Sequence, residues 1–289
     1  MTARLGALRG VAAASAGVAF ASLRAARAEE TDRRRLRVLI TGFHDWRDLD
    51  DEPGADLLRR RTSVAFGKGG SEGKGGAGAM WRCRDNPSCR LIYGEACAAP
   101  PLIRRGPLVR ALSALEEQAD FSYVTMPVLW GTASGLDVCA YDVVIHMGLG
   151  VYDRTDLLRL ESGAYNGRNG TDALARARDD ERIEATEGRH VQCDAMASRV
   201  DAVAAACKGG VGDGFELEVA GSTAENSYIC NETHWRGLKA CAASGQRLAA
   251  YFLHLPYASA DDHVALAAAV AGVVREMVRL EAARRDAAR

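Results

Sequence analysis

The 289-residue chain has no stretch of about 20 apolar residues, the length that an α-helix needs to cross a bilayer, so no membrane span is expected. It also has no excess charge of one sign, because 37 Lys and Arg residues face 38 Asp and Glu residues. A net charge of −1 creates no global field that would recruit nucleic acid or an acidic membrane. The composition therefore predicts neither nucleic acid nor membrane as a partner.

The eight cysteines form neither a standard zinc pattern nor a complete disulfide framework. Cys83, Cys89 and Cys97 cluster in one loop-like region, but their spacing is not that of a zinc site. We expect free or locally paired cysteines there. If Cys230 is a catalytic thiol, an odd number of cysteines remains, which argues against pairing throughout the chain. No metal site is predicted.

The first 28 residues are rich in Ala and Ser and contain no acidic residue before Glu29. Three interpretations stay open. A secretory signal would use residues 11–23 as its apolar region and Ala26-Arg27-Ala28 as its cleavage site. An organellar transit peptide would use the same Arg-rich, acid-free composition, which Arg24 and Arg27 fit slightly better. The third interpretation is an uncleaved, disordered tail.

A second unusual segment covers residues 48–84, which are charged at first and then Gly-rich. Such a composition cannot bury enough apolar area to order itself. The segment lacks the spacing of a phosphate-binding loop and does not directly follow a strand. We interpret it as a flexible surface insertion in a domain that spans residues 36–285.

The rest of the chain alternates between apolar strands and amphipathic helices, without an internal repeat. Strands are expected at residues 37–41, 121–128, 142–147, 215–220 and 248–255, and helices at 107–118, 194–207, 228–243 and about 261–284. The carboxylate of Asp261 is expected to cap the last helix. The apolar run at 142–147 is typical of a strand buried on both faces. The alternation predicts a single-domain α/β fold, a three-layer α/β/α sandwich with a largely parallel (mixed) central sheet.

One predicted helix and the strand that follows it carry a cysteine and a histidine at opposite ends of the pair. Cys230 lies at the start of the helix, and His254 lies near the end of the strand that follows. Unpaired N–H groups and a partial positive charge at a helix N-terminus favour the thiolate, which is the nucleophile. A histidine on a neighbouring strand can act as general base and acid. With Glu161 as an orienting carboxylate, these three residues match the roles of a cysteine-hydrolase triad.

Five sequence blocks in a fixed order extend this pattern. They are residues 41–46 (TGFHDW), 86–88 (NPS), 142–148 (DVVIHMG), 161–166 (ESGAYN), and 222–231 followed by 254–257 (HLPY). In this order they resemble pyroglutamyl peptidase I, the family of pyrrolidone-carboxylate cysteine peptidases. The resemblance runs from Val38 to about Val274 and is interrupted by the Gly-rich segment.

The resemblance implies a catalytic triad of Glu161, Cys230 and His254. Cys230 would attack the carbonyl after an N-terminal pyroglutamyl residue, and water would hydrolyse the acyl-enzyme, without a metal or organic cofactor. Phe43 and Trp46 match two phenylalanines that the family places around the pyroglutamyl ring. The partners implied are peptides with an N-terminal pyroglutamate. The resemblance implies a cytosolic protein, whereas the first 28 residues leave an organellar or a secreted location open. The resemblance is also compatible with a homo-oligomer.

Two asparagines are expected to support the site. Asn166 matches an asparagine of the family and is expected to hold the loop of Glu161, and Asn231 directly follows the nucleophile. The chain also departs from the family, since Glu225-Asn226 replaces an Ala-Gly pair. Asn tolerates the left-handed backbone that a Gly would adopt, but Glu225 brings a negative charge close to the thiolate.

These departures leave two alternatives open. One is a related cysteine amidase with a different acyl specificity, which Trp46 and Glu225 would explain. The other is a catalytically silent homologue that binds pyroglutamyl peptides in a decayed pocket. Retention of all three triad residues argues against the second.

Overall fold

The computed structural model describes residues 35–44, 86–94, 106–150, 154–191, 194–212 and 214–288. The N-terminal 28 residues, Trp46 and the Gly-rich segment at 48–84 lie outside these ranges, so the expectations about them stay predictions. Within the described ranges, no helix combines the length and apolar character that crossing a bilayer requires.

A six-stranded sheet forms the centre of the molecule, in the order β2-β1-β3-β10-β4-β9. The strands are β1 (Leu36–Phe43), β2 (Ala119–Met126), β3 (Val143–Leu149), β4 (Leu157–Glu161), β9 (Glu216–Ala220) and β10 (Ala249–Leu255). The first four strands in this order are parallel. Strand β4 runs antiparallel to β10, and β9 runs parallel to β4. The predicted largely parallel, mixed sheet is confirmed.

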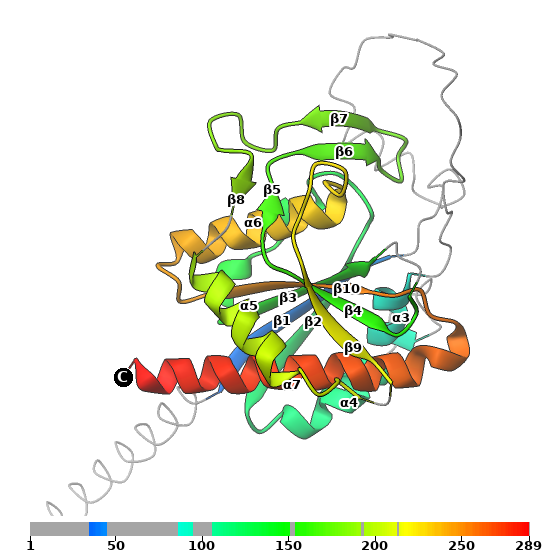
Figure 1. Cartoon of the computed structure of the whole chain (residues 1–289), viewed down its shortest axis with the longest axis vertical. Coiled ribbons are helices and arrows are strands. Elements are labelled where there is room, and N and C mark those ends of the chain that lie inside the picture. The colour runs from blue at the N-terminus through cyan, green and yellow to red at the C-terminus, as the bar shows by residue number, and fades with distance from the viewer. Residues whose placement is uncertain are drawn as a thin grey trace, which may run out of the picture.

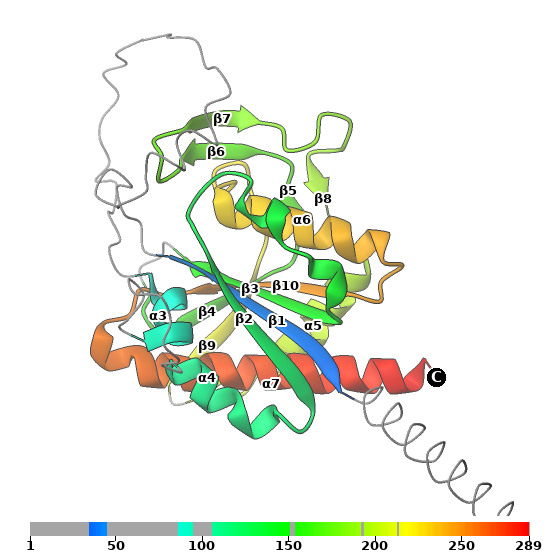
Figure 2. The ribbon, with the colours of Figure 1, turned by 180° about the vertical axis from the view of Figure 1, so that it is seen from behind.

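Helices cover both faces of this sheet (Figures 1 and 2). Helix α6 (Ile229–Ala243) lies on one face, and the other face carries α3 (Pro87–Tyr93), α4 (Pro107–Leu112), α5 (Asp194–Ala206) and α7 (His263–Ala287). Two small sheets lie beyond α6, one of β5 (Ala164–Tyr165) with β8 (His190–Val191) and one of β6 (Arg168–Thr171) with β7 (Ala177–Glu181). The three-layer α/β/α sandwich is thus confirmed.

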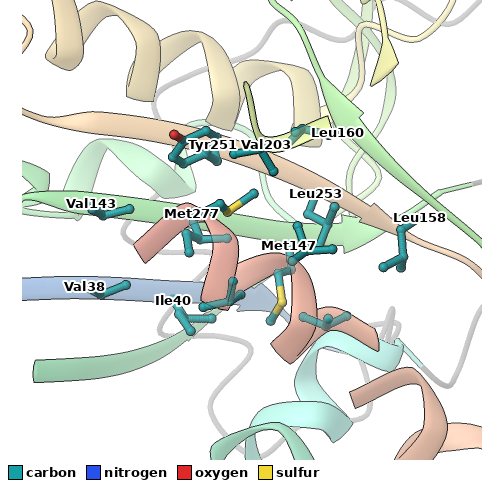
Figure 3. Close-up of a cluster of buried hydrophobic side chains, with 14 of the residues drawn as sticks. Val38, Ile40, Val143, Met147, Leu158, Leu160, Val203, Tyr251, Leu253 and Met277 are labelled. Carbon is teal, nitrogen blue, oxygen red and sulfur yellow. The ribbon is translucent and has the colours of Figure 1, made fainter. Parts of the chain in front are cut away.

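Side chains alternate between the two faces of each strand, as the period of a β-strand requires. One set packs with Met277 of α7 in the main apolar core, and Figure 3 shows several of its members: Val38, Ile40, Val143, Met147, Tyr251 and Leu253. The intervening positions of β3 and β10 therefore face α6, and they include His146 and His254. Since β3 and β10 are parallel, their carboxyl ends meet at one edge, where α/β proteins place their ligands.

Some expected boundaries were wrong. The helix expected at 107–118 ends at Leu112 and continues as a 3-10 helix over Ser113–Leu115, because the chain must turn before Ala119 pairs with Leu36 in the sheet. Asp261 does not cap the last helix. Helix α7 begins at His263 after Asp262, whose carboxylate instead accepts a 2.6 Å hydrogen bond from the Ser259 hydroxyl.

Candidate active site

The register of β10 places Phe252 and His254 beside β3, on the α6 face of the sheet. Phe252 pairs with His146, and His254 pairs with Gly148. On its other side, His254 lies opposite Arg159 of the antiparallel strand β4, which ends two residues later at Glu161. Two strands of opposite direction therefore bring a histidine and a carboxylate together.

Glu161, His254 and Cys230 lie in one connected arrangement. The Nδ1 atom of His254 is 2.8 Å from Oε1 of Glu161, and the His254 side chain is hydrogen-bonded to Cys230. With Nδ1 on the carboxylate, Nε2 is the ring nitrogen available to the thiol. Cys230 is a free cysteine and is partly exposed, whereas Cys89 takes part in a disulfide. The structure therefore brings the three predicted residues into the order that a triad requires.

The hydrogen bonds around His254 determine its charge. Burial lowers the pKa of His254, but the hydrogen bonds and charges of Cys230 and Glu161 outweigh burial and raise this pKa to about 10. Its folded pKa lies above the unfolded value of about 6.5. The imidazolium therefore contributes stability that is fully present below about pH 6.5 and is lost as the pH rises through about 10.

The start of helix α6 holds the thiol against the sheet. Cys230 is the second residue of α6, and the preceding Tyr228 makes no side-chain cap to the helix. The N–H groups of the first turn consequently have no N-cap side chain, and they carry the partial positive charge of the helix terminus. A Cβ atom at Gly148 would lie 2.7 Å from the Cys230 Sγ, so only glycine leaves space for the thiol.

A cavity of about 290 Å³ opens over these groups. Its walls include Glu161, Cys230, His254, Tyr228, Glu225 and His234. Glu225 is exposed, and hydrogen bonds from its own backbone and from Thr223 lower its pKa, which keeps it ionised. Asn226 also lines the cavity, but it has no left-handed backbone, since the described non-glycine residues with positive φ are Ala175, Asp180 and Gln246. The expected role of Asn226 in a left-handed turn was wrong.

Phe43 lies beside this cavity, in the apolar core. It is 2% exposed and packs with Met126, Trp130, Ile229 and Phe252, and the partly buried Cys230 lies against this cluster. It does not line the cavity. Because its partner Trp46 lies outside the described residues, the aromatic wall around a substrate ring stays a prediction.

The two asparagines each connect segments around the site. The Asn231 side chain donates to the carbonyls of Tyr165 (2.7 Å) and Gly167 (3.0 Å) and accepts from the Tyr165 N–H (2.7 Å). Asn166 donates to the Glu184 carbonyl (2.7 Å) and accepts from its N–H (2.9 Å). Asn231 thereby fixes the helix that carries Cys230 to the segment that follows Glu161.

Glu232, which no sequence pattern indicated, is 1% exposed and joins three segments. It pairs with Arg168 and Arg236, both at 2.8 Å, and accepts a hydrogen bond from the Gly131 N–H at 2.9 Å. Burial raises the pKa of Glu232, but these partners together lower it below its usual value. No local sequence signal predicts such a distant partner as Arg168.

Gly148 provides a direct test of the thiol position. We expect Gly148→Ala to displace the Cys230 Sγ from His254, because the new Cβ would come closer to sulfur than real Cβ atoms do. A nucleophile moved by about 1 Å can lose about 10²-fold in rate, and we expect alkylation of Cys230 by iodoacetamide to slow at least about tenfold. Gly135→Ala is the control, since a Cβ there meets no atom within 4 Å. Equal alkylation of both variants would contradict this placement.

Glu161→Gln tests the electrostatics of His254. The substitution removes a charge that raises the pKa of His254. We therefore expect this histidine to titrate near pH 10 in the wild type and at least about one pH unit lower in the variant. NMR titration of the imidazole measures both. His146, whose pKa burial lowers to about 4, is the internal reference and should not move. An unchanged His254 titration would be incompatible with this arrangement.

No family model and no curated protein matches the sequence. Solved structures do match. Pyroglutamyl peptidase I from Bacillus amyloliquefaciens is 17% identical with a TM-score of 0.51, and the alignment covers 84% of this chain and 97% of that one. Pyrrolidone carboxyl peptidase from Thermococcus litoralis is 18% identical with a TM-score of 0.53, over 87% and 96%. The chain therefore has the fold of these peptidases, as the sequence blocks predicted.

Proposed function

We propose that the chain is a divergent pyroglutamyl peptidase I, a cysteine exopeptidase that hydrolyses the amide bond after an N-terminal pyroglutamyl residue. The observation that carries the proposal is the arrangement of Glu161, His254 and Cys230 at the carboxyl edge of the sheet. The shared fold supports it, because solved structures with this fold are peptidases of that name. The substrates would be peptides with an N-terminal pyroglutamate.

The first half of the reaction forms an acyl-enzyme. The Cys230 sulfur attacks the carbonyl carbon, and a C–S bond forms while the carbonyl oxygen gains negative charge. N–H groups at the start of α6, including that of Cys230, would stabilise this oxyanion. His254 holds the thiol proton and gives it to the leaving amine as the C–N bond breaks. Glu161 fixes the imidazole tautomer and stabilises the imidazolium.

The second half restores the enzyme. His254, now neutral, takes a proton from water, and the resulting hydroxide attacks the thioester carbonyl. The C–S bond breaks and pyroglutamate leaves, so that the Cys230 thiolate is again paired with the protonated His254. These steps need no metal or organic cofactor. Trp46 would contact an apolar face of the ring, as a phenylalanine does in the family, and Phe43, which packs in the core beside the cavity, would support this contact without touching the ring.

A second candidate is a related cysteine amidase with another acyl specificity. Glu225 favours it, because this ionised carboxylate lines the same cavity as Cys230. A negative charge at that position would favour an acyl group or a leaving amine that carries a positive charge. The machinery would be the same, and only the preferred acyl group would differ.

Cys230→Ala tests the proposed activity. We expect it to lower hydrolysis of a pyroglutamyl arylamide by about 10⁴-fold or more, because the covalent route is lost. Cys139→Ala, which removes an exposed free cysteine, is the matched control and should keep the wild-type rate. Comparable rates for Cys230→Ala and the wild type would rule the proposal out. A panel of other acyl arylamides would support the amidase instead if one is cleaved faster than the pyroglutamyl compound.

A further inference from the structure

His234 is a polar residue in the wall of the cavity, and the proposed reaction gives it no role. It lies on α6 four residues after Cys230, so that both side chains are on one face of the helix in successive turns. His234 is 2% exposed, yet it lines the cavity together with Cys230 and His254. Its place is therefore next to the acyl group of any substrate that Cys230 attacks.

Neither ring nitrogen of His234 has a hydrogen-bond partner among the described residues. Its ring packs edge to face against Phe252, with centroids 5.8 Å apart. Buried polar groups are nearly always paired, because an unpaired one forfeits its hydrogen bonds to water. An unpaired imidazole in a cavity wall is thus suited to a ligand that supplies the partner.

The charges around His234 determine what kind of ligand it suits. Burial, followed by the neighbouring His146 and His254, lowers the pKa of His234 to about 3. The ring is consequently neutral at working pH and offers one donor and one acceptor. The imidazolium of His254 nearby disfavours a cationic partner, so a neutral polar group fits this position best.

His146 provides a contrast on the same face of the sheet. It is also buried, but its Nδ1 is hydrogen-bonded to the Thr41 hydroxyl at 2.7 Å. It does not line the cavity. Of these two buried histidines, His234 alone has both nitrogens unpaired and adjoins the site of attack.

We propose that His234 is a specificity-determining residue, whose neutral imidazole hydrogen-bonds the ring amide of a lactam acyl group bound at Cys230. The choice of a lactam rests on the proposed function. The Cβ atoms of residues four apart on a helix are about 5–6 Å from each other, a span that a five-membered ring and one hydrogen bond can bridge. An acyl ring without the amide would leave His234 unpaired, and sites of this kind reject such analogues strongly.

The test compares two substrates that differ only in the ring amide. One is a pyroglutamyl arylamide, and the other is the cyclopentanecarbonyl arylamide. We expect His234→Phe to lower kcat/KM for the pyroglutamyl substrate by about 10–100-fold, the cost of one lost hydrogen bond to a buried group, and to leave the cyclopentanecarbonyl substrate within about threefold. Equal losses on both substrates, or no loss on either, would overturn the proposal.

A second pair of variants separates hydrogen bonding from packing. The side chains that His234→Asn and His234→Leu introduce have the same branched shape and the same number of heavy atoms, but only Asn retains a donor and an acceptor. We expect Asn to preserve more of the preference for the pyroglutamyl substrate than Leu, with melting temperatures measured for both. Equal preference in Asn and Leu would contradict a hydrogen-bonding role.

A binding measurement distinguishes failure of this inference from failure of the proposed function. The probe is 2-pyrrolidone, the isolated lactam ring, and the readout is protection of Cys230 from iodoacetamide. We expect protection in the wild type and at least about tenfold weaker protection in His234→Phe. If the wild type hydrolyses no pyroglutamyl substrate but shows this difference, the proposed function fails and the lactam contact stands. If the wild type hydrolyses the pyroglutamyl substrate but 2-pyrrolidone protects Cys230 equally in both proteins, the contact between His234 and the lactam is overturned and the proposed function stands.

Discussion

The hydrogen bond between Glu161 and His254 is the interaction on which the rest of the site depends. It exists because the antiparallel strand β4 ends beside the parallel strand β10, so that the carboxylate meets Nδ1 at 2.8 Å. The carboxylate thereby fixes the ring so that Nε2 faces the thiol, and it helps to raise the pKa of His254 to about 10. Without this pair, the start of α6 would present an isolated cysteine.

The position of α6 is the second constraint. The absence of a side chain at Gly148 lets the Cys230 sulfur approach β3. Behind it, Glu232 joins α6 to β6 and to the backbone of Gly131 through buried hydrogen bonds and ion pairs. Breaking a buried ion pair by removing one partner typically costs about 3–5 kcal/mol. Such anchors hold the Cys230 thiol in place at the edge of the cavity.

Much of this arrangement follows from sequence periodicity. The apolar run of β3 predicted a strand buried on both faces, and the alternation of strands with helices predicted a largely parallel sheet. The predicted start of α6 and end of β10 placed Cys230 and His254 within reach of each other. Strand β4 was not predicted, because a five-residue segment shows little periodicity and its antiparallel direction depends on the strands beside it. The partners of Glu232 depend in the same way on how distant segments pack. His234 did have a local signal, since its spacing of four from Cys230 puts both on one helix face.

The proposed reaction requires that Cys230 form a covalent bond to the acyl group during turnover. Rapid acid quenching of the reaction with a pyroglutamyl arylamide, followed by mass spectrometry of the peptide that contains Cys230, measures this directly. We expect a pyroglutamyl thioester on Cys230 in the wild type and none in His254→Ala. An adduct on another residue would contradict covalent catalysis by Cys230. So would hydrolysis without any adduct under conditions where acylation is faster than deacylation.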